Sequence, residues 1–148
     1  MSQVSQQLYA RSRPQTFSTV VLAEFHPGSL RLDYCNAGHN PPFIFSGGEV
    51  RTLEPGGTVA GLVQLWDYQQ GSEQLKSGDV LLLYTDGVIE AINEQDEEFG
   101  EQQLIDLVQT NTFLTAADIQ QLIVDQVFAF CGEAEQADDI TIVALKVE

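Results

Sequence analysis

The stretch that decides the fold is Val80-Leu81-Leu82-Leu83-Tyr84, followed at once by Thr85-Asp86-Gly87. Five consecutive apolar residues bounded by turn residues predict a strand that is buried on both faces and lies inside a sheet. A second such central strand is predicted over 140–145, directly after Asp138 and Asp139. If the two strands are antiparallel neighbours, the end of the first lies beside the start of the second. Asp86 and Asp138 would then meet at one edge of the sheet.

This pair of carboxylates is a candidate metal site. Two carboxylates a few ångströms apart repel each other unless a cation lies between them. Oxygen ligands with no His or Cys nearby favour Mg²⁺ or Mn²⁺. In the alternative interpretation, Thr85-Asp86-Gly87 is an ordinary turn, and Asp138 and Asp139 are an ordinary polar start to a strand. The residues by themselves leave both interpretations open.

His39 is a second candidate, within Asn36-Ala37-Gly38-His39-Asn40-Pro41-Pro42. A glycine beside polar residues and two prolines predicts a sharply bent connection, which can aim a side chain at a site. In the alternative interpretation, His39 only satisfies a local backbone carbonyl group, as is common in such turns. His26, beside Pro27, is predicted to lie on the surface.

Strands dominate the first half of the chain and helices the second. Turn residues separate apolar segments in two predicted hairpins, 17–25 with 30–35 and 43–45 with 50–53. Further strand is predicted over 65–70 and at Leu75. The first dozen residues are predicted to be helical, as are the segments that begin near 104 and after Thr115, a predicted N-cap. The fold class is therefore α+β, with mainly antiparallel strands covered by C-terminal helices.

The charge balance excludes some classes of partner. The 148 residues include 6 Lys+Arg and 22 Asp+Glu, which gives a net charge of −16. So few basic residues cannot form a surface for nucleic acid or for an anionic membrane. The first residues do not have the pattern of a signal segment, and no apolar run is long enough to span a bilayer. Cys35 and Cys131 lack the spacing of a zinc site or a disulfide framework, which favours a cytoplasmic location.

Four motifs occur in an order that indicates a family. They are 36–42, the stretch from Ser77 to Ala91, Phe99-Gly100, and Asp138-Asp139-Ile140-Thr141-Ile142-Val143. Together they closely resemble the SpoIIE-type branch of the metal-dependent protein phosphatases, the PPM family. The resemblance implies an α-β-β-α sandwich in which a two-metal Mn²⁺ or Mg²⁺ centre removes phosphate from phosphoserine or phosphothreonine in a signalling protein. It also implies that Asp86 and Asp138 bind the same metal ion, with His39, Gly87 and Asp139 adjacent to the site.

The chain departs from the family pattern near its N-terminus. Family members carry a Gly-Asp-x-x-Gly segment, whose Asp bridges the two metals, upstream of the strand that matches 17–25. Here the sixteen residues before Phe17 contain no Asp or Glu. We therefore expect residues 1–148 to form a single, N-terminally truncated phosphatase domain. This partial sandwich should be inactive alone and should self-associate through exposed strand edges.

Two other functions stay open. A non-catalytic, phosphatase-like regulatory module would keep the fold and bind a protein partner without metal chemistry. A small acidic cation-binding protein is suggested only by the overall charge and by the run from Glu94 to Glu98, which lacks the ligand spacing of a calcium loop. For the phosphatase, the family resemblance suggests an anti-sigma-factor antagonist as the phosphoprotein substrate.

Overall fold

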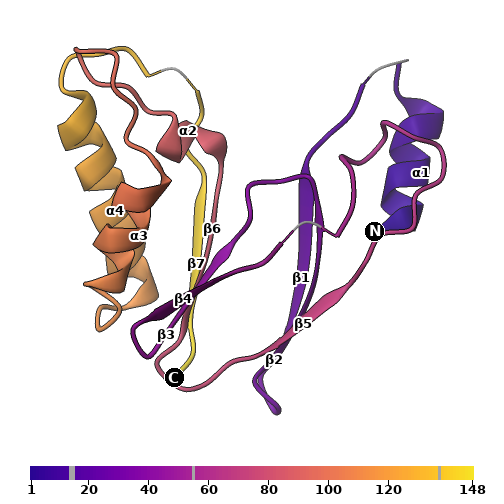
Figure 1. Cartoon of the computed structure of the whole chain (residues 1–148), viewed down its shortest axis with the longest axis horizontal. Coiled ribbons are helices and arrows are strands. Elements are labelled where there is room, and N and C mark those ends of the chain that lie inside the picture. The colour runs from indigo at the N-terminus through magenta and orange to yellow at the C-terminus, as the bar shows by residue number, and fades with distance from the viewer. Residues whose placement is uncertain (14–15, 55, 137) are drawn as a thin grey trace. The chain divides into compact units, whose positions relative to one another are not determined.

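The computed structural model describes residues 1–13, 16–54, 56–136 and 138–148. The chain forms two compact units, each assembled from two segments that are separated in the sequence. The first unit comprises Met1–Pro41 and Leu53–Leu75, and the second comprises Pro42–Thr52 and Lys76–Glu148. Each unit contains one antiparallel sheet, as the strands in Figure 1 show.

The sheet of the first unit has three strands in the order β1-β2-β5. They are β1 (Val20–His26), β2 (Arg31–Ala37) and β5 (Gly71–Gln74). The first predicted hairpin is confirmed, because β1 and β2 pair along their whole length. The strand predicted over 65–70 is wrong, since strand pairing with β2 begins only at Gly71. Before Gly71 the backbone bonds to a loop instead of to β2, since the Gln69 amide donates to the Gly56 carbonyl at 2.7 Å.

Helix α1 (Ser2–Arg11) confirms the helix expected at the start of the chain. Its Leu8 packs on a small core that includes Tyr68. Ser5 is almost fully buried, and its hydroxyl accepts hydrogen bonds from the Tyr68 hydroxyl and the Gly61 amide, both at 3.0 Å. Polar as well as apolar contacts therefore fix α1 to the loop that precedes β5.

The sheet of the second unit has four strands in the order β4-β3-β6-β7. They are β3 (Phe43–Ser46), β4 (Glu49–Thr52), β6 (Val80–Tyr84) and β7 (Ile142–Lys146). The second hairpin is confirmed, and β6 lies inside the sheet as its apolar run predicts. The central position expected for β7 is wrong, because β7 ends the sheet among the described residues and Val143 is 51% exposed. Apolar composition shows that a strand has buried faces, not that it has two neighbours.

Helices α3 (Glu101–Gln109) and α4 (Ala116–Cys131) pack on one face of this sheet and lie side by side (Figure 1). A single helical turn, α2 (Asp86–Ile89), follows β6. The Thr115 hydroxyl caps α4 as predicted, accepting a hydrogen bond from the Asp118 amide at 3.2 Å. The core between sheet and helices contains Phe43, Phe45, Val80, Leu82, Tyr84, Val88, Leu104, Val108, Ile119, Ile123 and Val127. The α+β class with antiparallel strands and C-terminal helices is therefore confirmed.

Candidate metal site

Strands β6 and β7 run side by side (Figure 1) and pair antiparallel. Their pairing ends with Tyr84 opposite Ile142. Because β6 ends where β7 begins, the residues after Tyr84 and before Ile142 lie at the same edge of the sheet. The pairing on which the sequence argument depended is therefore present, and Asp86 and Asp138 belong to this edge. We call the segments 85–87 and 138–141 the β6–β7 edge.

Close backbone contact holds the two segments of the β6–β7 edge together. The Thr85 amide donates to the Thr141 carbonyl at 3.1 Å, which extends the ladder beyond the two strands. Gly87 lies so near that a Cβ atom on it would be 2.5 Å from the Asp139 carbonyl oxygen and 3.2 Å from that of Asp138. Only glycine permits this approach. The backbone directly after Asp86 therefore lies against the segment that leads into β7.

The two candidate carboxylates are exposed and only partly engaged. Asp86 Oδ1 accepts a hydrogen bond from the Gly87 amide at 3.1 Å, and Asp138 Oδ1 accepts one from the Asp139 amide at 2.7 Å. From the described residues, the second oxygen of each carboxylate receives neither a hydrogen bond nor an ion pair. The Gln136 side chain donates to the Asp138 carbonyl at 2.7 Å and steadies the backbone there. Each carboxylate thus keeps one oxygen available for a cation.

This donor set fits a hard divalent cation but does not complete its coordination. Carboxylate oxygens suit Mn²⁺ and Mg²⁺, and Mg²⁺ takes about six ligands. Within the described ranges, no group of three His, Cys, Asp or Glu side chains is arranged to hold a metal ion. The sequence has no Lys or Arg between Lys76 and Lys146, so no basic side chain of that segment can neutralise the pair. The β6–β7 edge therefore offers two candidate carboxylate ligands, without a complete ligand set among the described residues.

Two further residues of this edge connect its two segments by hydrogen bonds. Asp139 contributes its backbone carbonyl, which accepts a hydrogen bond from the Thr85 hydroxyl at 3.0 Å. Thr85, which is not predicted from the sequence as part of this site, also accepts a hydrogen bond through its hydroxyl from the Thr141 amide at 2.9 Å. A Thr directly after a buried strand was the available signal, because its hydroxyl can bond to nearby backbone groups.

The segment around His39, in the first unit, is a hydrogen-bonded turn. The buried Asn36 side chain donates to the His39 carbonyl at 3.0 Å and accepts from the His39 amide at 2.8 Å. Gly38 takes a left-handed conformation with φ of 72°. The half-buried His39 ring places Nδ1 at 3.1 Å from the Thr19 hydroxyl, so its partner is a side chain rather than a backbone carbonyl. Asn36, which sequence reasoning passed over, builds this turn through an Asx-type bond.

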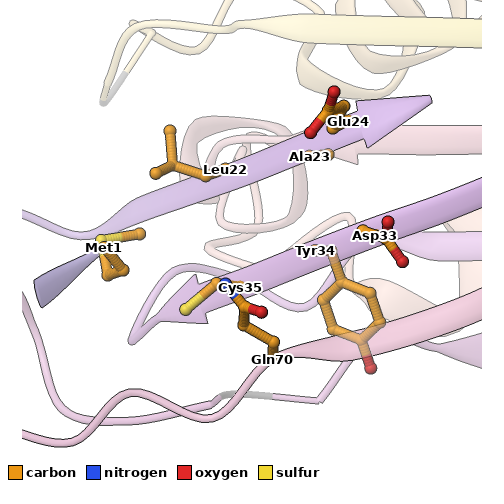
Figure 2. Close-up of a pocket in the computed structure, with 8 residues that line it drawn as sticks. All are labelled: Met1, Leu22, Ala23, Glu24, Asp33, Tyr34, Cys35 and Gln70. Carbon is orange, nitrogen blue, oxygen red and sulfur yellow. The ribbon is translucent and has the colours of Figure 1, made fainter. Parts of the chain in front are cut away.

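A hollow of about 330 Å³ lies on the sheet of the first unit (Figure 2). Glu24 of β1 and Asp33 and Cys35 of β2 are among the residues that line it. Asp33 Oδ2 is already engaged by Arg31 Nη2 at 2.7 Å and by His26 Nε2 at 3.0 Å. Burial raises the pKa of the Cys35 thiol, which disfavours the reactive thiolate. The hollow therefore offers neither a free pair of carboxylates nor an activated thiol.

Comparison with known proteins identifies the family. The sequence model of the family described as Stage II sporulation protein E (SpoIIE) matches residues 1–148. The chain belongs to the SpoIIE family. Protein IcfG of a Synechocystis strain is 31% identical to this SpoIIE-family chain over 130 residues, which are 87% of the chain and 20% of that protein. Phosphoserine phosphatase RsbU of Bacillus subtilis is 30% identical over 122 residues, 81% of the chain and 31% of that protein.

The fold agrees with membership of the SpoIIE family. The SiaA-PP2C domain of Pseudomonas aeruginosa matches with a TM-score of 0.83 and 21% sequence identity, covering 97% of this chain and 57% of that one. The resemblance to the SpoIIE-type phosphatases drawn from the four motifs is thus confirmed. The chain spans about a fifth to a third of the length of these two curated relatives. Nowhere in the described ranges does a helix have the length and apolar character needed to cross a membrane.

Proposed function

We propose that this chain contributes to the active site of a metal-dependent phosphatase that acts on phosphoserine or phosphothreonine in a signalling protein. The observation that carries the proposal is the β6–β7 edge, where Asp86 and Asp138 each have one carboxylate oxygen that no described residue engages. These two residues would share one Mn²⁺ or Mg²⁺ ion. Such an ion would neutralise negative charge on the phosphoryl group and supply an activated water near neutral pH.

The role of the protein at this edge is to hold the two carboxylates in place before the ion binds. The contact at Gly87 and the bonds of Thr85 fix the backbone on both sides of the site. Both carboxylates are exposed, which leaves the edge open to a phosphorylated side chain of another protein. Membership of a family whose relatives include a named phosphoserine phosphatase supports this substrate class. By the same likeness, an anti-sigma-factor antagonist is the partner we propose.

We further propose that the centre needs ligands beyond these two. Two carboxylates leave roughly four of six coordination positions to water or to other groups. The SiaA-PP2C domain extends beyond the part that this chain matches, which supports a contribution from a further part of the domain. Without it, we expect Mn²⁺ to bind with a dissociation constant on the order of 10⁻³ M. We also expect no hydrolysis of a phosphoserine peptide by the chain alone.

Binding of Mn²⁺ to the ¹⁵N-labelled chain tests the site, because the paramagnetic ion broadens nearby amide signals even when it binds weakly. We expect the amides of 85–87 and Asp139 to broaden first. Asp86→Asn and Asp138→Asn should each remove this localised broadening. Asp125→Asn is the matched control, since this exposed carboxylate lies on α4 and should leave the broadening unchanged. Broadening that is centred elsewhere, or that survives both substitutions, would exclude the proposed site.

The non-catalytic module is the second candidate, because no third acidic or histidine ligand accompanies the pair among the described residues. A module that has lost metal chemistry predicts no localised Mn²⁺ binding at the β6–β7 edge. The same titration therefore separates the two functions. Hydrolysis of a phosphoserine peptide by the chain alone, abolished by Asp86→Asn, would instead show that the two carboxylates are sufficient.

A further inference from the structure

Thr85 occupies the N-cap position of α2, yet its side chain makes no capping hydrogen bond. A threonine at this position normally accepts a hydrogen bond from an amide in the first turn of its helix, as Thr115 does for α4. The Thr85 hydroxyl instead donates to the Asp139 carbonyl at 3.0 Å and accepts from the Thr141 amide at 2.9 Å. The hydroxyl therefore acts as donor and as acceptor towards the same segment, the one that leads into β7.

These bonds join the two candidate ligands by a short path. Asp86 follows Thr85 directly, and Asp138 precedes Asp139 directly, so each carboxylate is one residue from a bonded group. The Thr85 amide adds a third bond to this segment, at 3.1 Å to the Thr141 carbonyl. The side-chain hydroxyl is the part of this connection that a substitution can remove without changing the backbone ladder.

We propose that Thr85 is a positioning residue that sets the placement of Asp138 relative to Asp86 and so determines how well the pair holds a divalent cation. This inference rests on the metal site proposed above. Groups that orient metal ligands without touching the ion typically change metal affinity by about 10-fold to 100-fold when they are removed. Thr85 is such an orienting group, because its hydroxyl connects the segment of Asp86 to the segment of Asp138.

The experiment compares two substitutions of Thr85. Thr85→Val keeps the shape of the side chain but can neither donate nor accept, whereas Thr85→Ser keeps the hydroxyl. We expect Thr85→Val to weaken Mn²⁺ binding at the β6–β7 edge by about 10-fold, and Thr85→Ser by less than about 3-fold. Affinity is measured by the amide broadening titration, and thermal unfolding of each variant is recorded beside it. Amide hydrogen exchange at Thr141 should become faster in Thr85→Val but not in Thr85→Ser, which keeps the acceptor of this amide.

Thr115→Val is the matched control, because it removes a threonine hydroxyl that caps a helix elsewhere in the second unit. It should lower the unfolding temperature without changing Mn²⁺ affinity. A merely structural role for Thr85 predicts the same behaviour for Thr85→Val, and that result would overturn the inference. If Asp86→Asn and Asp138→Asn also leave binding unchanged, the metal site itself is wrong. If they abolish binding while Thr85→Val does not weaken it, only the role of Thr85 is wrong.

Discussion

At the scale of single residues, Gly87 is fixed by the backbone that faces it. A Cβ atom at this position would lie 2.5 Å from the Asp139 carbonyl oxygen, so Gly87→Ala forces one segment of the β6–β7 edge to move. We expect a loss of about 1–3 kcal/mol in the free energy of unfolding, measured by urea denaturation. Gly28→Ala is the control, because nothing lies within 4 Å of a Cβ there and the change should be nearly neutral. Equal effects of the two substitutions would contradict this account.

Asn36 and His39 have different roles in the same turn: the Asn36 side chain bonds to the turn backbone, and the His39 ring contacts a side chain. Asn36→Ala would leave the His39 amide and carbonyl without their side-chain partner inside a buried turn. We expect a loss of about 2–4 kcal/mol in the free energy of unfolding. His39→Ala removes one contact with the Thr19 hydroxyl and should cost about 1 kcal/mol or less. Urea denaturation of both variants checks the order, and a larger loss for His39→Ala would reverse our assignment.

At the scale of elements, Asp33 connects the strands of the first sheet. A hydrogen bond with Ser72 of β5, together with bonds from Arg31 and His26, lowers the pKa of Asp33. A carboxyl group with a lowered pKa in the folded state stabilises the fold above its unfolded pKa, and this contribution is lost as the pH falls through the folded pKa. We therefore expect the stability difference between the wild type and Asp33→Asn to be complete at about pH 6 and to shrink below about pH 4.

Urea denaturation over a series of pH values measures this difference. Glu24→Gln is a suitable control, because Glu24 lies opposite Asp33 and has no partner for its carboxylate among the described residues. A stability difference for Asp33→Asn that stays constant from about pH 6 to about pH 3 would show that the bonds to Asp33 do not stabilise the folded state.

Most elements could be predicted from the sequence because their signals are local. The apolar run of β6, the turns of both hairpins and the cap at Thr115 each depend on residues that are near neighbours in the chain. The strand predicted over 65–70 is wrong because residue types do not supply a pairing partner. A strand needs a neighbouring strand, and the Gln69 amide is bonded to the Gly56 carbonyl instead.

At the scale of the whole molecule, net charge and sheet edges have opposite effects on association. A net charge of −16 opposes self-association at low ionic strength. Strand β7, however, ends its sheet in the described residues with Val143 half exposed. Lys146 does not protect the unpaired side of strand β7 from another strand, because its ammonium group donates to the Thr112 and Leu114 carbonyls at 2.9 and 2.7 Å.

We therefore expect the chain to be monomeric in about 0.02 M NaCl and to self-associate in about 0.5 M NaCl, where salt screens the repulsion. Sedimentation velocity measures the change. Val143→Lys should suppress the association, because a charge on an edge strand opposes pairing with another strand. Phe113→Lys is the control, since this side chain is 74% exposed but lies in the loop between α3 and α4. Suppression by the control to the same extent would show that general hydrophobicity, not the edge of β7, drives the association.

The sequence by itself determined most of the elements, the acidic charge and the two carboxylates at strand ends, because each of these depends on residue type and on spacing along the chain. Tertiary structure alone decided that β7 lies at a sheet edge, that Asn36 rather than His39 builds its turn, and that the Thr85 hydroxyl faces the start of β7. The physical reason is that hydrogen bonds and close approaches between strands join residues far apart in sequence. Thr85 and Asp139 show this, because their bond exists only once β6 and β7 have paired.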